Sequence, residues 1–208
     1  MIRQAYLDAA DVAARLLREP ALAERWRRPS ALPEMSIAAL AYHLASQITL
    51  TVSYLAAPPG RAAIPLLRHY TDNDWVTSGL HGETNVAIRE GSDRAAADTT
   101  PDALADEVDA AIATLRQVVP AQPADRIVDF RRWGLTVDDF LTTRVMELVV
   151  HSDDLAVSLD IPTPAMPVEA TGATIALLAQ VAAWRHGPLA VVRALARGER
   201  APQRITAL

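Results

Sequence analysis

Hydrophobic residues recur along most of the chain at the three- to four-residue spacing of an α-helix. Five runs show this spacing clearly: residues 3–17, 37–55, 101–119, 137–155 and 168–186. Two shorter helices are predicted from Pro20 to Trp26 and from Pro188 to Arg197. Only residues 126–130 form a short run typical of a strand. The pattern therefore predicts an all-α protein.

Capping and helix-breaking residues predict where the central helices begin and end. Ser36 can cap the second long helix, and Pro58-Pro59-Gly60 ends it. Thr100-Pro101-Asp102 is typical of a helix start, because proline is tolerated at the first helical position. Thr136 can cap the helix that follows. These signals predict well-defined helices on either side of residues 64–98.

Two proline-containing linkers divide the chain, at residues 119–125 and 161–167. We expect the second linker to separate a helical bundle in residues 1–160 from a short helical extension in residues 161–208. The extension carries too little sequence for a core of its own, so we expect it to pack on the bundle.

Residues 64–98 are polar and aromatic, with only a moderate helical pattern. We interpret this segment as a helix with a lid over a pocket. His81 and Glu83 lie in it as candidate functional residues. They rank second, because side chains two positions apart on a helix point in different directions.

Composition excludes several classes of protein. The chain has 208 residues, of which 50% are hydrophobic, which is enough for a real core. Its net charge of −5 offers no general affinity for nucleic acid or for anionic lipid. No apolar run is long enough to span a membrane, and the first twenty residues do not resemble a secretory signal. We therefore expect a soluble, cytoplasmic protein, with no cysteine for disulfide or thiolate chemistry.

The chemistry is concentrated in the run from Leu141 to Leu155. Helical spacing places Arg144, Glu147, His151 and Asp154 on one face, surrounded by aliphatic residues. One interpretation is a solvated pair of Glu147 with His151 on the helix surface. The other is a buried pair, which requires a counter-charge or a metal ion because unpaired buried charges are costly. Imidazole and carboxylate are ordinary ligands for divalent first-row metals.

His43 lies beside the apolar stripe of the second long helix. A single histidine in such a place is more often a structural residue than a ligand. His43 becomes a candidate ligand because of the helix that carries Glu147 and His151. Two facing helices of a bundle commonly supply the ligands of one site, here one ligand and two.

These residues resemble a known family. Ser36-Ile-Ala-Ala-Leu-Ala-Tyr-His43-Leu-Ala, with Thr143-Arg-Val-Met-Glu147-Leu-Val-Val-His151-Ser-Asp-Asp154-Leu155, is similar to the N-terminal metal-binding domain of the mycothiol-dependent maleylpyruvate isomerase family. The resemblance implies a DinB-like four-helix bundle with long crossovers. It also implies that His43, Glu147 and His151 are metal ligands, for zinc or alternatively nickel, iron or manganese.

The resemblance implies an enzyme that uses a low-molecular-weight thiol such as mycothiol. Three protein ligands leave open positions on a metal, where a thiol would become a thiolate near neutral pH. The thiolate could then transfer sulfur to a small electrophile, or assist the cis-trans isomerisation of a substrate such as maleylpyruvate. We expect catalytic roles for Arg144, which can bind a carboxylate or orient Glu147, and for Asp154, which can hold a histidine tautomer. The expected partners are the thiol and a small substrate, in a monomer or homodimer.

Two other functions stay open at this point. A DinB-like protein could bind a metal or a small ligand without turnover. An all-α transcriptional regulator would fit the length, but the N-terminus has no recognisable helix-turn-helix. Peptide hydrolysis is disfavoured because the His-Glu-x-x-His motif is absent, and neither a phosphate-binding glycine loop nor a Gly-x-Ser-x-Gly elbow is present.

Overall fold

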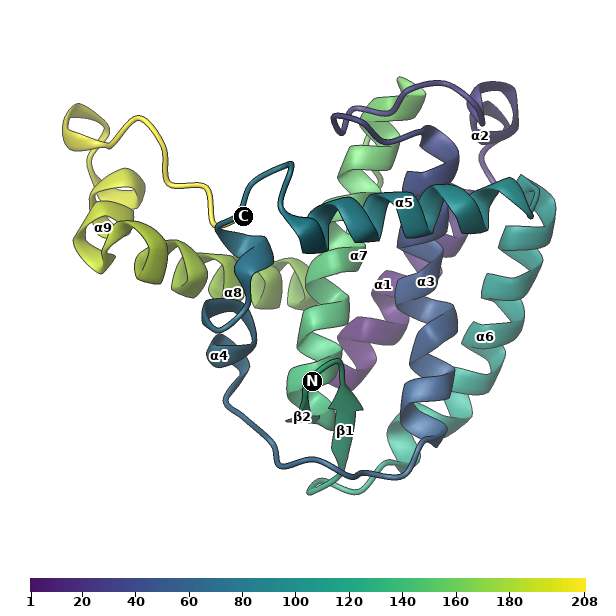
Figure 1. Cartoon of the computed structure of the whole chain (residues 1–208), viewed down its shortest axis with the longest axis horizontal. Helices are drawn as coiled ribbons and strands as arrows, with labels where there is room; N and C mark the ends of the chain where they lie inside the picture. Colours follow the sequence, from purple (N-terminus) through teal and green to yellow (C-terminus); the bar gives the residue numbers. More distant parts are fainter.

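Four long helices pack along one another to form the body of the protein (Figure 1). They are α1 (Ile2–Leu17), α3 (Ile37–Ala56), α6 (Pro101–Ala121) and α7 (Val137–Leu159). The remaining helices are α2 (Pro20–Arg25), α4 (Leu66–Thr71), α5 (Glu83–Ala97), α8 (Val168–His186) and α9 (Pro188–Ala196), with short 3-10 turns η1 (Asp74–Val76) and η2 (Gly198–Arg200). This computed structural model describes residues 1–208. The all-α prediction and the four-helix bundle are confirmed.

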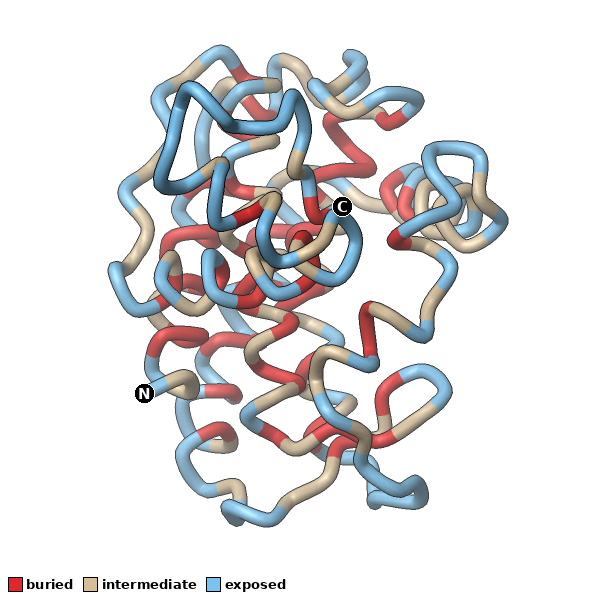
Figure 2. The backbone as a smooth tube through the Cα atoms, turned by 90° about the vertical axis from the view of Figure 1, so that its left-hand side faces the viewer, coloured by how far each residue is buried: buried red, intermediate tan, exposed pale blue.

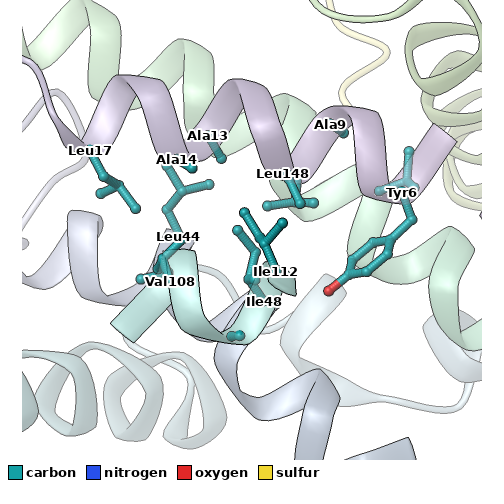
Figure 3. Close-up of a cluster of buried hydrophobic side chains, with 14 of the residues drawn as sticks. Tyr6, Ala9, Ala13, Ala14, Leu17, Leu44, Ile48, Val108, Ile112 and Leu148 are labelled. Atoms are coloured by element: carbon teal, nitrogen blue, oxygen red, sulfur yellow. The ribbon is translucent and has the colours of Figure 1, made fainter. Parts of the chain in front are cut away.

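The bundle core forms where the apolar faces of these four helices meet. Figure 3 shows residues of α1 above Leu44 and Ile48 of α3, with Val108 and Ile112 of α6 and Leu148 of α7 close by. The α1 face is lined largely by alanines that have no exposed surface, so its backbone can approach its neighbours closely. In Figure 2 the buried residues accordingly lie mainly toward the inside of the molecule.

The predicted caps are present at the starts of the long helices. The hydroxyl of Ser36 accepts a hydrogen bond from the Ala39 amide, at 3.0 Å, and also donates to Asp93 at 2.8 Å. Thr100 and Thr136 accept from the amides of the third residue after each of them. The bond to Asp93 matters for the site, because it attaches α5 to the beginning of α3.

A long crossover from α3 to α6 contains α4, η1 and α5. Helix α5 crosses in front of α3 and α7 in Figure 1, and it packs against α3. Its sequence is mostly polar, and only Ser92 and Ala96 are buried. Residues 64–98, whose helical pattern is only moderate, therefore form helices that lie across the bundle and do not add a fifth helix to it.

A small antiparallel hairpin precedes α7, formed by β1 (Ile127–Phe130) and β2 (Trp133–Thr136). The sequence pattern indicated the first strand but not the second. Gly134 explains the difference, because its amide and carbonyl pair with Ala62 and Ile64 of the crossover, each at 3.0 Å. A side chain at Gly134 would collide with the Arg61 carbonyl, at 2.8 Å. The hairpin thus holds the beginning of the crossover.

The C-terminal helices α8 and α9 lie to one side of the bundle (Figure 1). Helix α8 packs against α7, α1 and α4. A second, smaller hydrophobic cluster forms there, separate from the bundle core: Tyr70, Val76, Met146, Leu177, Val181, Ala182, Val191 and Ala207. Helix α7 contributes to both clusters, with Leu148 in the bundle core and Met146 in the smaller one.

No helix of the protein is both long enough and apolar enough to cross a membrane.

Replacing Leu148 by alanine is expected to lower the free energy of unfolding by about 2–5 kcal/mol, because Leu148 has no exposed surface and the change leaves a cavity in the core. The matched control is Val157→Ala on the same helix, where the side chain is 57% exposed and the expected change is within about 0.5 kcal/mol. Urea denaturation followed by circular dichroism measures both. Equal losses in the two variants would contradict the placement of the core.

Candidate metal centre

Helices α3 and α7 face each other and bring three potential metal ligands together. His43 comes from α3, and Glu147 and His151 come from α7. The Nε2 atom of His43 lies 3.2 Å from Oε2 of Glu147, and the Nε2 atom of His151 lies 3.1 Å from the same oxygen. One potential ligand atom from each of the three residues lies within 4.8 Å of the others.

These side chains are not on a solvated helix face. His43 and Glu147 are each 17% exposed, and His151 is 19% exposed. The periodicity of α7 explains this position: Val145, Leu148 and Leu155 point into the bundle core with no exposed surface, while the polar residues one or two positions away point to the opposite side. The interpretation of Glu147 and His151 as an ordinary surface pair is therefore wrong.

The charges of the site depend on one another. Burial raises the pKa of the Glu147 carboxyl, but hydrogen bonds with His151 and His43 outweigh burial and hold this pKa well below its usual value. Burial lowers the pKa of His43, and its bond to Glu147 does not compensate. For His151 burial also acts to lower the pKa, but bonds with Asp154 and Glu147 raise it to about 9. Glu147 is thus an anion at neutral pH, with one neutral and one protonated imidazole beside it.

The donor set fits a divalent metal ion. Ligand atoms about 2.0–2.1 Å from a tetrahedral zinc lie roughly 3.3 Å from one another. The two imidazole nitrogens lie at 3.2 and 3.1 Å from the Glu147 oxygen, close to that spacing, and all three ligand atoms lie within 4.8 Å of one another. Nitrogen and oxygen donors suit zinc and several other first-row divalent metals.

Asp154 lies behind His151. Its Oδ2 atom is 2.9 Å from Nδ1 of His151, and a proton on Nδ1 leaves the Nε2 lone pair directed at Glu147 once the ring is neutral. Ligating histidines usually have such a carboxylate on the other ring nitrogen. Asp154 therefore lies where a residue that orients His151 is needed.

Arg144 lies one turn before Glu147 without bonding to it. Its guanidinium donates to Oε1 of Gln47, at 2.5 Å, and to the Thr143 hydroxyl, at 3.0 Å. It also stacks over the Phe130 ring, with 4.6 Å between the guanidinium carbon and the ring centroid. Burial lowers the pKa of Arg144, and no carboxylate lies within ion-pair distance of it. A half-buried cation without a counter-ion is a site for an anion.

A cavity of about 590 Å³ opens onto this group of residues. His43, Glu147, His151 and Arg144 all line it, together with Gln47. The crossover, the hairpin and the C-terminal helices supply the remaining walls. Four of the candidate residues from the sequence, His43, Arg144, Glu147 and His151, therefore line one pocket.

The fold and this geometry agree with what the chain is similar to. A family model described as the mycothiol maleylpyruvate isomerase N-terminal domain matches residues 6–156. The chain belongs to this family. No curated protein and no solved structure showed a significant match.

The match covers the bundle, apart from the first residues of α1 and the last of α7, together with the hairpin, and it includes all the candidate site residues described above. Helices α8 and α9 lie outside it. From these C-terminal residues, Arg185 and Leu208 also line the cavity. The pocket of this member of the mycothiol maleylpyruvate isomerase family therefore has walls that the family domain does not supply.

His69 is a pocket residue that sequence reasoning missed. It lies on the six-residue helix α4, and its Nδ1 atom is 3.0 Å from the indole nitrogen of Trp133. Because an indole N–H only donates, Nδ1 must accept, and a neutral ring then carries its proton on Nε2. Burial, with the nearby Arg144 and Arg131 cations, lowers the pKa of His69 to about 4. His69 is therefore a neutral imidazole in the pocket wall.

The two second-rank candidates do not join the site. The side chain of His81 is 78% exposed, and its Nδ1 atom lies 3.9 Å from Glu34 on the surface. Glu83 occupies the first turn of α5 and makes no ion pair. Neither residue lines the cavity. The segment contributes through Trp75, Ile88 and other wall residues instead.

The low pKa of His69 predicts a pH-dependent loss of stability in acid. An unfolded histidine titrates near pH 6.5. The unfolded chain therefore binds a proton between about pH 6.5 and 4 that the folded protein excludes, so His69 contributes stability above this window and loses it as the pH falls. The difference amounts to roughly 3 kcal/mol.

Urea denaturation across this pH range should show a steeper loss of stability for the wild-type protein than for His69→Gln, which cannot titrate. Comparing the two slopes removes the contribution of every other titrating group that they share. Parallel slopes would show that His69 takes up its proton in the folded state as easily as in the unfolded chain.

Proposed function

We propose that the protein is a metal-dependent enzyme that uses a low-molecular-weight thiol, either to transfer sulfur to a small electrophile or to isomerise one. The observation that carries the proposal is the convergence of both imidazole Nε2 atoms on one carboxylate oxygen of Glu147, inside a pocket. Membership of a family named for mycothiol maleylpyruvate isomerase supports the choice of thiol chemistry.

In this proposal His43, Glu147 and His151 hold the divalent cation, with zinc as the leading candidate. A bound cation supplies Lewis acidity, which lowers the pKa of a thiol so that it reacts as a thiolate near neutral pH. Asp154 keeps the proton of His151 on Nδ1 and so leaves Nε2 free to act as a ligand.

The electrophile is bound and polarised by Arg144 and His69, which also line the pocket. When a thiolate adds to a double bond conjugated with a carbonyl, a carbon–sulfur bond forms and the electron pair moves onto the carbonyl oxygen. The former double bond can then rotate, and loss of the thiolate restores it in the trans form. Arg144, which has no internal counter-ion, is placed to stabilise the developing negative charge. His69 can donate a second hydrogen bond to the same oxygen through Nε2.

Metal content tests the ligand set directly. We expect about one equivalent of a divalent metal in wild-type protein purified without chelator, and a large loss in His151→Ala, because one of three protein ligands is removed. The matched control is His81→Ala, another histidine of the same chain, which should keep its metal because His81 lies on the surface. Plasma mass spectrometry gives the stoichiometry.

Asp154→Asn should weaken metal affinity by about 10- to 100-fold, as is usual when the partner of a ligating histidine is replaced. Wild-type protein that neither contains metal nor takes up zinc or nickel on titration would exclude the proposed centre.

Turnover tests the reaction. Wild-type protein with mycothiol should convert maleylpyruvate to its trans isomer, or should couple the thiol to a general electrophile such as chlorodinitrobenzene. Chromatography detects both products. Arg144→Met should raise KM by about 10- to 100-fold with unchanged metal content, because a charge-assisted hydrogen bond is lost. Metal-loaded protein that forms neither product would favour the alternative of a bundle that binds metal or ligand without turnover.

A further inference from the structure

The pocket has two chemically different walls. One wall is polar and carries the three candidate metal ligands with Gln47 and Arg144. The other wall is apolar, and we call it the roof: Met35, Trp75, Val76, Leu80, Ile88 and Val150. Most of the roof comes from the crossover segment around η1 and α5, which Figure 1 shows lying across the bundle.

The roof is apolar on the side facing the cavity although its helix is mostly polar. Helix α5 contains Arg89, Glu90 and Asp93 around Ile88, and its average residue is polar. Arg89, which also lines the cavity, pairs with Glu34 at 3.0 Å, so its charge is compensated. Trp75 and Val150 pack against the smaller hydrophobic cluster and extend its surface into the cavity. The part of a ligand under the roof must therefore be apolar to replace water favourably.

The polar wall offers cationic groups that can bind an anion. Arg144 and Arg131 both stack on the Phe130 ring, at 4.6 and 5.7 Å from its centroid, and neither makes an ion pair. Arg131 also adopts a left-handed backbone conformation, with φ of 57°, at the turn of the hairpin. A two-residue hairpin loop requires positive φ at this position, so the turn fixes where the Arg131 side chain leaves the backbone. Two unpaired guanidinium groups on one ring fit a carboxylate.

The cavity has room for both parts of such a ligand. Its volume of about 590 Å³ lies within the range of roughly 300–1,000 Å³ of pockets that enclose drug-sized molecules. A small dianion would leave the roof facing water. The combination of an anion site, a long apolar wall and this volume favours a larger amphipathic molecule.

We propose that the substrate of this site is an anion with an apolar body of medium length, whose carboxylate binds Arg144 and Arg131 and whose body lies under the roof. This inference deepens the proposed function by naming the class of electrophile. Binding of the anion requires neither thiol nor turnover, so it can be tested even if the proposed reaction is wrong.

The test uses straight-chain monocarboxylates from butyrate to decanoate, titrated calorimetrically into the purified protein without thiol. Each added methylene should lower Kd by roughly three- to fourfold until the roof is filled, because each buried methylene contributes about 0.8 kcal/mol. Maleate and succinate serve as short dianion probes. A Kd that does not change with chain length, or dianions that bind more tightly than octanoate, would overturn the proposal.

Ile88→Asn places a polar group in the roof and should reduce the gain per methylene while butyrate affinity stays within about twofold. The matched control is Ile175→Asn on α8, where the side chain is 64% exposed and does not line the cavity. It should keep the wild-type dependence on chain length. Leu80→Asn in the loop before α5 is the second roof variant should Ile88→Asn fail to fold by circular dichroism. An unchanged chain-length dependence in a folded roof variant also overturns the proposal.

Discussion

A buried carboxylate between two imidazoles is the interaction on which the arrangement of this protein depends. Glu147 lies between α3 and α7 with only 17% of its side chain exposed, and an isolated charge there would cost several kcal/mol. His151, one turn further along α7, neutralises the charge, and the neutral ring of His43 on α3 hydrogen-bonds to the same oxygen, so α3 and α7 must keep a fixed register. Asp154 and Gln47 are in turn positioned by bonds to these groups or to their neighbours. The polar residues on this face of α7 are therefore positioned around a single anion, Glu147.

Helix α7 has to satisfy this anion and the bundle core at the same time. Its apolar face packs on α1, which can approach closely because so many of its inward residues are alanine. Its polar face lies on the other side, where the crossover and the hairpin form the walls of a cavity. The crossover from α3 to α6 and the hairpin before α7 thus supply much of the binding surface. Loops carried by a rigid scaffold commonly have this role.

Local sequence patterns were sufficient for the all-α class and for the helix starts, because helical periodicity and capping are properties of neighbouring residues, whereas the four-helix bundle and the candidate ligand set came from the family resemblance. They placed His43, Glu147 and His151 on helices that do face each other. They did not reveal β2, whose pairing depends on Gly134 meeting a segment seventy residues away. They also did not reveal His69, because its role depends on Trp133 across the crossover. The only local sign of either feature is the pair Trp133-Gly134 shortly before the helix that carries Glu147 and His151.

The existence of two hydrophobic clusters has a consequence for how the protein can change over evolutionary time. Leu148 belongs to the bundle core, whereas Met146, two residues earlier, belongs to the cluster that borders the cavity. Substitutions at positions of the two clusters that lie more than about 7–10 Å apart and share no partners act on stability almost independently. Natural variation can therefore remodel the pocket wall, and with it the range of accepted ligands, while the scaffold that holds the polar centre keeps its stability. Diversification of specificity within one stable architecture is built into this division.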